Sequence, residues 1–390
     1  MRILISAYAC EPGEGSEPEV GFQTVLAAAR EHEVWVITRG NNVASLRSAL
    51  SRKKNIHVIA HDVEGPALRA KNLGGLLTLH LYHDLWQRRL GELAVSLDRE
   101  HNFDLIHHVT FAAYWSRAGV ASVAKPLVWG PLGGGVAPPV SLLPAMGLFG
   151  AASDLTRVLV RPLFARMSKA PLTAEKADII LVQNHETARR IRQPSKTRLL
   201  PNGVVGGLHV EAEPHDRHPI VAAGRLIGWK GMALAISAMR HMDDDQVLDI
   251  YGEGPDRRRL ERLARRRGVQ ERVRFRGRVP RDEVLTAIAG ARVFLHPALH
   301  EDSGMAVAEA LTAGTPVVCL DRGGPPVLLR RWPNVPSRVV SPSTPGVTAR
   351  RLASALNEVA DLRAETDLAP AEEFGNELLA IYTDLSKRAR

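Results

Sequence analysis

Two glutamates with seven residues between them offer the clearest chemistry in this sequence. Glu301 follows the apolar segment 293–296, which we expect to form a strand, and Glu309 falls inside the segment 306–313, which we expect to form a helix. A carboxylate in a loop can accept hydrogen bonds from sugar hydroxyls, and one inside the helix can accept both hydroxyls of a ribose. A capped helix with an acidic residue near its start would look similar. Because an acidic residue among Ala, Val and Leu needs a reason, we favour the binding role.

The residues between these glutamates could bind an anion. Ser303, Gly304 and Met305 stand at the expected start of the helix, where backbone amides have no partner within the helix. These amides and the helix dipole favour a phosphate group.

Two cations follow another expected strand, at 220–223. Arg225 lies in Gly224-Arg225-Leu226, and Lys230 in Trp229-Lys230-Gly231. Open α/β sheets bind ligands at the carboxyl ends of their strands, and a guanidinium with an ammonium there can neutralise a diphosphate. An exposed loop with ordinary surface charge is the alternative.

Two further turns are weaker signals. Gly252 lies in Tyr-Gly-Glu-Gly-Pro after one strand, and Gly277-Arg278-Val279 closes the next. A glycine there lets a flat ligand approach the backbone, but a plain strand-to-helix turn explains each equally well.

The elements that must position these residues alternate between short apolar runs and helical patterns, which is typical of parallel sheets wrapped by helices. We expect strands at 2–6, 33–38, 56–60, 105–107, 127–129, 179–182, 198–200, 220–223, 247–251, 273–275, 293–296 and 316–320. We expect helices at 232–239, 257–266, 281–289 and 306–313. The polar segment 211–219 reads as a linker, which divides the chain into domains 1–208 and 209–370.

Composition agrees with a globular α/β protein. The chain has 390 residues, 45% of them hydrophobic and 24% charged, which suits two domains with their own cores. A net charge of +9 suits an anionic partner, and two cysteines exclude a disulfide framework. Residues 1–9 form too short an apolar run for a secretory signal, and glycines and prolines break the apolar region 119–152. We therefore expect a cytoplasmic protein, at most peripheral to the inner membrane face.

The second half resembles the family-4 glycosyltransferases, which are retaining enzymes with the two-domain GT-B fold. The resemblance runs in order through the motifs at Arg225 and Lys230, Gly252, Arg278 and Val279, and Glu301 to Glu309. It implies that Arg225 and Lys230 hold the donor diphosphate, Glu309 the ribose and Glu301 the sugar hydroxyls. The backbone near Arg278 and Val279 would meet the base, and Gly224, Gly252, Ser303, Gly304 and Met305 would complete the donor site. The last helix, 371–390, would pack back on the first domain.

The first half resembles the family more loosely. After the first strand the family has a Gly-rich loop near the phosphates and the acceptor, here represented by Gly13, Gly15, Ser16 and Glu17. This loop carries four glutamates, at 11, 14, 17 and 19, which would repel a diphosphate. We interpret some of them as facing a polyhydroxyl or cationic acceptor, such as an amino sugar or aminocyclitol.

A histidine pair and a glycine run complete the candidate acceptor residues. The segment 103–108 resembles the family strand that delivers a histidine to the cleft, and His107 and His108 compete for that role. Strand alternation allows only one, and we favour His108. Gly133 and Gly134 would let the backbone approach the acceptor or a phosphate; structural roles for all four remain open.

The reaction implied is transfer of a sugar from a nucleoside diphosphate sugar, a UDP-sugar by preference, to a hydroxyl with retention of configuration. The resemblance implies neither a metal nor another cofactor, with Arg225, Lys230, Glu301 and His108 in catalytic roles. The acceptor could be a small molecule, a glycan or a lipid-linked sugar, in natural-product or cell-surface glycan biosynthesis.

Two other functions stay open. A GT-B sugar-nucleotide epimerase would share this architecture. A non-catalytic protein could instead bind a membrane through the basic segments 257–267 and 155–169. We do not expect nucleic-acid binding, because 257–267 has no aromatic residues for stacking.

Overall fold

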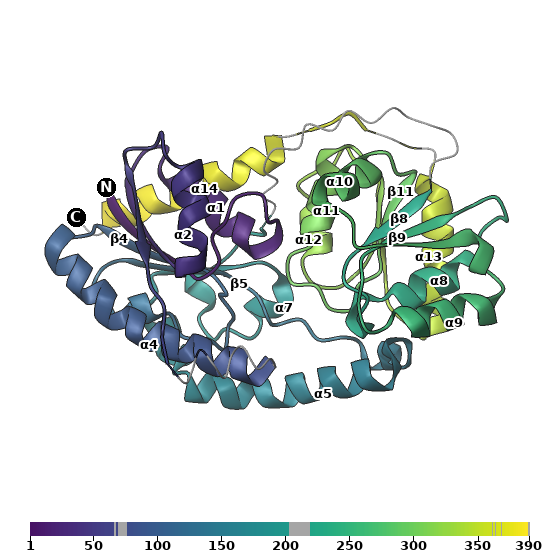
Figure 1. The fold of residues 1–390 in the computed structure, drawn as a ribbon, viewed down its shortest axis with the longest axis horizontal. Coiled ribbons are helices and arrows are strands. Elements are labelled where there is room, and N and C mark those ends of the chain that lie inside the picture. The colour runs from purple at the N-terminus through teal and green to yellow at the C-terminus, as the bar shows by residue number, and fades with distance from the viewer. Residues whose placement is uncertain are drawn as a thin grey trace. The chain divides into compact units, whose positions relative to one another are not determined.

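The computed structural model describes residues 1–65, 68, 76–202, 219–360, 362, 364–367 and 369–388. The chain divides into two compact units (Figure 1). Unit 1 comprises Met1–Gly135, Val160–Gly206 and Glu372–Arg390, and unit 2 comprises Val136–Leu159 and Gly207–Ala371. The predicted linker, 211–219, lies outside the described residues except for Pro219.

Unit 1 is built on a seven-stranded parallel sheet in the order β3-β2-β1-β4-β5-β6-β7. Its strands are β1 (Arg2–Ala7), β2 (Glu33–Thr38), β3 (Ile56–Ala60), β4 (Leu105–Thr110), β5 (Leu127–Leu132), β6 (Ile179–Val182) and β7 (Thr197–Leu199). β1, β4, β5 and β6 are buried along nearly their whole length because helices cover both faces of the sheet.

Helices α1 (Ser16–Ala28), α2 (Gly40–Ala49) and α14 (Ala369–Arg388) cover one face of this sheet (Figure 1). Phe374, Leu378 and Tyr382 of α14 pack in the same core as Ile3 and Ile5 of β1. Helices α4 (Leu76–His101) and α6 (Ala170–Lys176) cover the other face, where Trp86 and Leu90 of α4 are fully buried. The short helix α7 (His185–Ala188) follows β6.

Unit 2 is built on a six-stranded parallel sheet in the order β10-β9-β8-β11-β12-β13. Its strands are β8 (Ile220–Ala223), β9 (Leu248–Tyr251), β10 (Val273–Gly277), β11 (Val293–His296), β12 (Val317–Leu320) and β13 (Ser337–Val340). Helices α8 (Met232–Met239), α9 (Arg257–Arg267) and α13 (Pro345–Val359) pack on one face. Helices α10 (Arg281–Ala289), α11 (Met305–Thr312) and α12 (Pro325–Leu329) follow β10, β11 and β12.

The twelve expected strands are all present, and the four expected helices of the second half lie within a residue of their predicted ends. The predicted doubly wound α/β architecture is therefore confirmed. One strand was missed. β13 lies at the edge of its sheet, and its residues 338 and 339 are exposed, so it lacks the apolar run that marks a buried strand.

The residues from Val136 to Leu159 belong to unit 2, although the prediction placed them in the first domain. They include most of helix α5 (Leu143–Met167), whose geometry breaks at Gly147, with a φ of 73°. Leu142 and Met146 are fully buried in the core of unit 2. By length and composition alone, the stretch Val140–Met167 is also the one helix among the described residues that could cross a membrane.

Candidate functional site

The predicted donor residues gather at the carboxyl edge of the second sheet. β8 lies between β9 and β11, so the chain leaves neighbouring strands β8 and β11 toward opposite sides of the sheet. Such a reversal opens a crevice beyond the strand ends, and ligands bind there in open α/β sheets. The loop after β8 carries Arg225 and Lys230, and the loop after β11 carries Glu301.

Three turn glycines lie side by side along this edge. Gly224 donates its amide to the carbonyl of Tyr251 (2.9 Å), and Gly252 donates to the carbonyl of Gly277 (2.7 Å). Gly252 has a φ of +130°, and a Cβ there would stand 2.0 Å from the carbonyl oxygen of Gly224. Gly252 is therefore needed for these strand ends to meet, which agrees with the plain-turn explanation of its motif.

Lys230 and Glu301 meet as an ion pair between the ammonium and a carboxylate oxygen. The same carboxylate oxygen lies 3.4 Å from Nε2 of His296, at the end of β11. Burial by itself would raise the pKa of Glu301, but Lys230 and His296 outweigh it and hold that pKa well below its ordinary value. Glu301 is therefore an ionised acceptor, and His296 is a neighbour that the motifs did not reveal.

Glu309 is a buried carboxylate on α11, as its apolar neighbours predicted. Nη2 of Arg281, at the start of α10, lies 2.5 Å from its Oε1. Burial raises the pKa of Glu309, and the nearby guanidinium offsets part of that rise. No motif pointed to this partner, because the two residues are 28 positions apart.

The loop before α11 is held by close backbone packing. Gly304 forms the N-cap of α11 with a φ of 96°, which favours glycine. Gly324 donates its amide to the carbonyl of Glu301 (3.1 Å), and a Cβ on Gly323 would stand 1.8 Å from that carbonyl oxygen. The loop of Ser303, Gly304 and Met305 thus has one fixed course into the helix. Arg225 and Arg278 are exposed, and Val279 is half-buried.

Residues 136–159 pack against the loops that follow β8 and β11. The guanidinium of Arg157 lies over the ring of Trp229, 4.3 Å from its centroid. Asp154, which is 1% exposed, lies 3.5 Å from Nδ1 of His300. This segment therefore contacts the residues next to both Lys230 and Glu301.

The Gly-rich loop after β1 uses two of its four glutamates internally. Glu19 is buried and accepts from the amide of Gly13 (2.7 Å), and Glu11 accepts from the hydroxyl of Ser45 (2.9 Å). Glu14 is exposed and Glu17 is half-buried. By exposure, Glu14 and Glu17, beside Gly13, Gly15 and Ser16, are the glutamates of this loop that an acceptor could reach.

His107 and His108 are both fully buried, on opposite faces of the sheet. Nε2 of His107 donates to the carbonyl of Gly130 (2.7 Å), so its Nδ1 accepts from the hydroxyl of Tyr382 (2.6 Å). Nδ1 of His108 lies 3.1 Å from Oγ of Ser6. Burial lowers the pKa of His107 to about 4, and burial together with His107 lowers that of His108 to about 3. Neither ring lies on the surface of unit 1, so the expected delivery of His108 to a cleft is not what this geometry provides.

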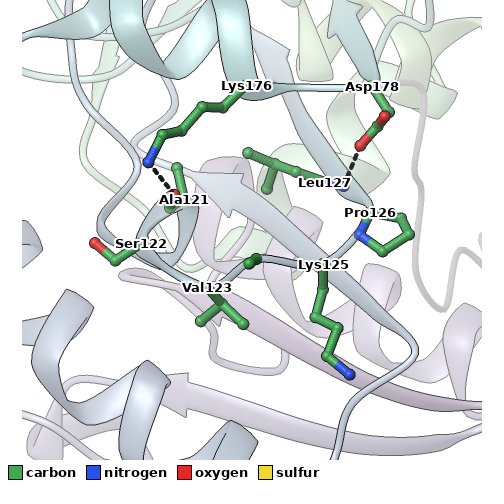
Figure 2. Close-up of a pocket in the computed structure, with 9 residues that line it drawn as sticks. Ala121, Ser122, Val123, Lys125, Pro126, Leu127, Lys176 and Asp178 are labelled. Atoms are coloured by element: carbon green, nitrogen blue, oxygen red, sulfur yellow. Dashed lines mark hydrogen bonds between the residues drawn. The ribbon is translucent and has the colours of Figure 1, made fainter.

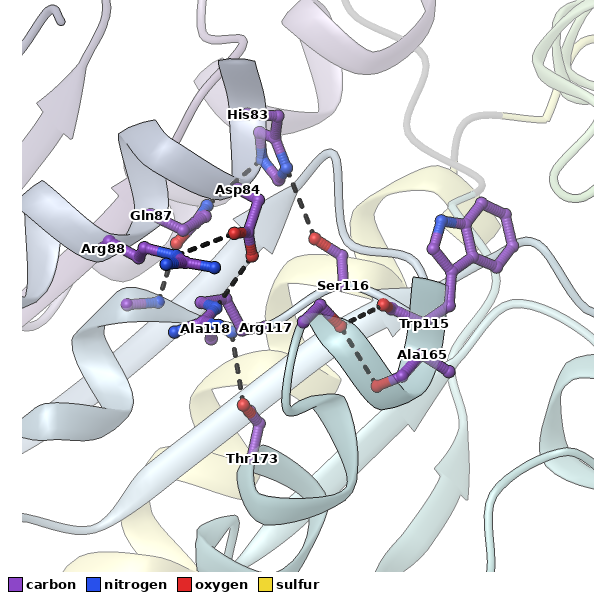
Figure 3. Close-up of polar contacts among 12 residues, drawn as sticks. His83, Asp84, Gln87, Arg88, Trp115, Ser116, Arg117, Ala118, Ala165 and Thr173 are labelled. Carbon is purple, nitrogen blue, oxygen red and sulfur yellow. Dashed lines mark hydrogen bonds and ion pairs between the residues drawn. The ribbon is translucent and has the colours of Figure 1, made fainter. Parts of the chain in front are cut away.

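A polar network fixes the loop that follows β4 (Figure 3). Asp84 of α4 accepts from Nε of Arg117 and from Nε of Arg88, both at 2.8 Å. The amide of Gly119 donates to Gln87 (2.7 Å), and the hydroxyl of Ser168 donates to the carbonyl of Trp115 (2.5 Å). The motifs did not reveal this network, because its members come from three separate segments of the chain.

Gly133 and Gly134 are buried. Gly134 has a φ of +90°, and a Cβ there would stand 1.9 Å from the ring of Trp115. The amide of Gly133 donates to the carbonyl of Ala112 (2.9 Å). Internal packing thus explains this glycine run, rather than the approach of a ligand that we expected.

A cavity of about 470 Å³ lies at the other edge of the first sheet (Figure 2). Lys176 donates to the carbonyl of Ala121 (3.1 Å), and Asp178 accepts from the amide of Leu127 (2.8 Å). These residues precede β5 and β6, so the cavity opens at the amino ends of the strands, away from the edge where α/β sheets bind ligands. Within the described part of the chain, no group of three or more His, Cys, Asp or Glu side chains could hold a metal ion.

Known proteins are similar to this chain in sequence and in fold. The family described as Glycosyl transferases group 1 matches residues 209–367. A 2-deoxystreptamine glucosyltransferase of Streptomyces kanamyceticus is 25% identical over 91% of this chain and 89% of its own length.

Solved structures match the fold over the whole chain. The lipopolysaccharide outer core galactosyltransferase WaaB, in its apo form, has a TM-score of 0.62 at 16% identity over 100% of this chain and 99% of its own. Anabaena HepE in complex with UDP has a TM-score of 0.58 at 17% identity, over 100% and 99%. The family match falls on the second half of the chain, and together with these relatives and structures it supports a glycosyltransferase with the GT-B fold.

Proposed function

We propose that this enzyme transfers a sugar from a UDP-sugar to a hydroxyl of an amine-bearing acceptor, with retention of configuration and without a metal ion. The observation that carries this proposal is the meeting of Lys230 and Glu301 between the ends of β8 and β11. There, a cation that can bind phosphate is in direct contact with an ionised carboxylate that can accept hydrogen bonds from sugar hydroxyls.

Donor binding uses charge that is already in place. Arg225 and Lys230 bind the diphosphate, and the amides before α11 add donors for its oxygens. Glu301 accepts hydrogen bonds from the donor sugar, and Glu309 accepts them from the ribose. The similar structure of HepE in complex with UDP supports UDP as the nucleotide.

The bond changes balance without a general base from the protein. The bond between the anomeric carbon and the donor phosphate breaks, while a bond from that carbon to the acceptor oxygen forms on the same face. The proton of the acceptor hydroxyl passes to the leaving phosphate oxygen. Lys230 and Arg225 stabilise the charge that develops on the diphosphate.

Acceptor binding falls to the loop after β1. Glu14 and Glu17 can attract ammonium groups, because Glu14 is exposed and Glu17 is half-buried, so that each side chain reaches solvent. The relative named a 2-deoxystreptamine glucosyltransferase supports an aminocyclitol acceptor in natural-product biosynthesis. We propose a cytoplasmic site of action, where nucleotide sugars are made.

The test measures nucleotide release from UDP-, GDP-, ADP- and TDP-sugars, with EDTA and with either 2-deoxystreptamine or a non-aminated cyclitol as acceptor. We expect turnover of a UDP-sugar, insensitive to EDTA and faster with the aminated acceptor. Glu14→Gln with Glu17→Gln should raise the KM for the aminated acceptor about tenfold and leave hydrolysis of the donor unchanged. Glu186→Gln, on α7, is the matched control.

Each part of the proposal can fail by itself. Turnover of another nucleotide sugar alone would contradict UDP, and loss of turnover with EDTA would contradict the metal-free reaction. Equal KM values for the two acceptors would contradict the acceptor class. An inverted anomeric product, read by NMR, would contradict retention.

A further inference from the structure

The beginning of α5 exposes large apolar side chains of unit 2. Leu148 is 90% exposed and Phe149 is 93% exposed, and Val140 just before them is 81% exposed. Leu155 and Leu159 continue the exposed side of the helix. Spacings of seven and then four residues after Leu148 place these leucines on one face. Contiguous exposed side chains of this kind mark an interaction surface.

The opposite side of the same helix is anchored in unit 2. Met146 is fully buried, Asp154 lies beside His300, and Arg157 covers the ring of Trp229. The charged residues Asp154 and Arg157 are thus committed to the protein. A stretch held in this way lies along a surface with its apolar face outward, although its length and composition would also allow it to span a bilayer.

An arginine-rich helix stands directly beside this apolar end. Nη1 of Arg259, on α9, donates to the carbonyl of Ala145 (3.2 Å). A Cβ on Gly147 would stand 3.1 Å from the same arginine side chain. Helix α9 and the start of α5 are therefore neighbours within unit 2.

Helix α9 carries seven arginines and one glutamate. Arg262 and Arg266 follow Arg259 by three and seven residues, so they continue its side of the helix, and both are exposed. A row of cations thus runs along the helix that flanks Leu148 and Phe149. An aromatic and aliphatic tip beside a row of guanidinium groups matches the interface of an anionic bilayer.

We propose that this apolar–arginine face, formed by Leu148, Phe149, Arg262 and Arg266, docks unit 2 on the surface of an anionic phospholipid bilayer. Phe149 and Leu148 enter the boundary between headgroups and acyl chains, and the arginines bind lipid phosphates. The binding is peripheral and reversible, and it requires neither the donor nor the acceptor of the proposed reaction. It therefore stands or falls separately from the proposed function.

Co-sedimentation of the full chain with vesicles tests this surface. The vesicles are pure phosphatidylcholine, or phosphatidylcholine with phosphatidylglycerol at 30%, each at low and high salt. We expect the chain to bind the anionic vesicles at least tenfold more tightly than the neutral ones, and less tightly at high salt, because salt screens the arginines.

Paired variants separate the two parts of the face. Leu148→Ser with Phe149→Ser should weaken binding by more than tenfold, since each side chain loses burial in the bilayer. Arg262→Gln with Arg266→Gln should weaken binding to anionic vesicles roughly fivefold for each arginine. All four side chains are exposed, so these variants should fold and keep turnover of soluble substrates. Leu81→Ser and the pair Arg52→Gln with Lys54→Gln, exposed positions of unit 1, are the matched controls.

Several outcomes would overturn the proposal. These are equal binding to neutral and anionic vesicles, no binding to either, or the same loss in the control variants. Self-association by analytical ultracentrifugation that Phe149→Ser abolishes, without vesicle binding, would assign this face to a second copy of the chain instead.

Discussion

The carboxyl edges of the two sheets differ in the interactions that hold their residues. In unit 2 the strand ends bring charged groups together, with Lys230 against Glu301 and Arg281 against Glu309. In unit 1 the corresponding strand β4 buries His107 and His108, and the loops beyond it are held by internal hydrogen bonds. The donor edge is thus preorganised by charge, whereas the other edge is shaped by packing. Three predictions test this difference between the two edges.

The largest effect should come from the ion pair at the donor edge. Lys230→Met should lower kcat by about 100- to 1000-fold, because it removes a cation from the developing diphosphate charge. Glu301→Gln should cost a similar factor, and the double variant little more, since the two side chains act as a unit. Lys176→Met, at the opposite edge of the first sheet, should keep full activity in the same assay. Strict additivity of the two losses would argue that Lys230 and Glu301 act independently.

The next effect concerns the stability of unit 1 in acid. The pKa of His107 is about 4 in the folded chain, below the ordinary value of about 6.5. The unfolded chain therefore takes up the proton first, so stability is complete above pH 6.5 and falls as the pH drops toward 4. At about 1.4 kcal/mol per pKa unit, His107 alone should cost roughly 3 kcal/mol at pH 4.

Denaturant unfolding at pH 7.5 and at pH 4 measures this loss. His107→Gln, which stays neutral, should show a smaller drop between the two pH values than the natural chain. His57→Gln, at a partly exposed histidine, is the control. An equal drop in the chain and in His107→Gln would mean that His107 does not titrate during unfolding.

The smallest effect should come from the partner of Glu309. Arg281→Gln leaves a buried carboxylate without its cation, so the pKa of Glu309 should rise further and donor binding should weaken about tenfold. Calorimetry with UDP measures the Kd, and Arg281→Lys should restore most of the affinity. Arg274→Gln, at an exposed position on β10, should change nothing. An unchanged Kd for Arg281→Gln would separate Glu309 from the donor.

The sequence allowed most of the fold to be predicted, and also the gathering of Arg225, Lys230 and Glu301 at one edge of the second sheet, because both depend on short spacings. Apolar runs mark buried strands, and the residues that follow them fall at one sheet edge. The partners of these buried residues could not be predicted from the sequence. Arg281 is 28 positions from Glu309, and Tyr382 is 275 positions from His107. Such pairs depend on topology, which spacing along the chain does not encode.

The glycine and histidine motifs of the first half show the same limit. Gly134 could equally serve a ligand or the ring of Trp115, and two adjacent histidines could equally serve chemistry or packing. Only the neighbours decide: Trp115 in the loop after β4 for Gly134, Tyr382 of α14 for His107 and Ser6 of β1 for His108. Residues 136–159 illustrate the point further, because no change in composition marks their place in unit 2.

Helix α14 has a consequence for how the chain is made. Its residues Phe374, Leu378 and Tyr382 complete a core that otherwise consists of the first and middle parts of the chain. A ribosome delivers β1 and α1 first, but the face of the sheet that α14 covers stays open to water until the last helix emerges. Nearly all of unit 2 precedes that helix in the chain, so unit 2 can complete its core earlier. Unit 1 begins first and finishes last, so premature termination near residue 370 should leave a chain with one completed unit and one exposed apolar sheet face.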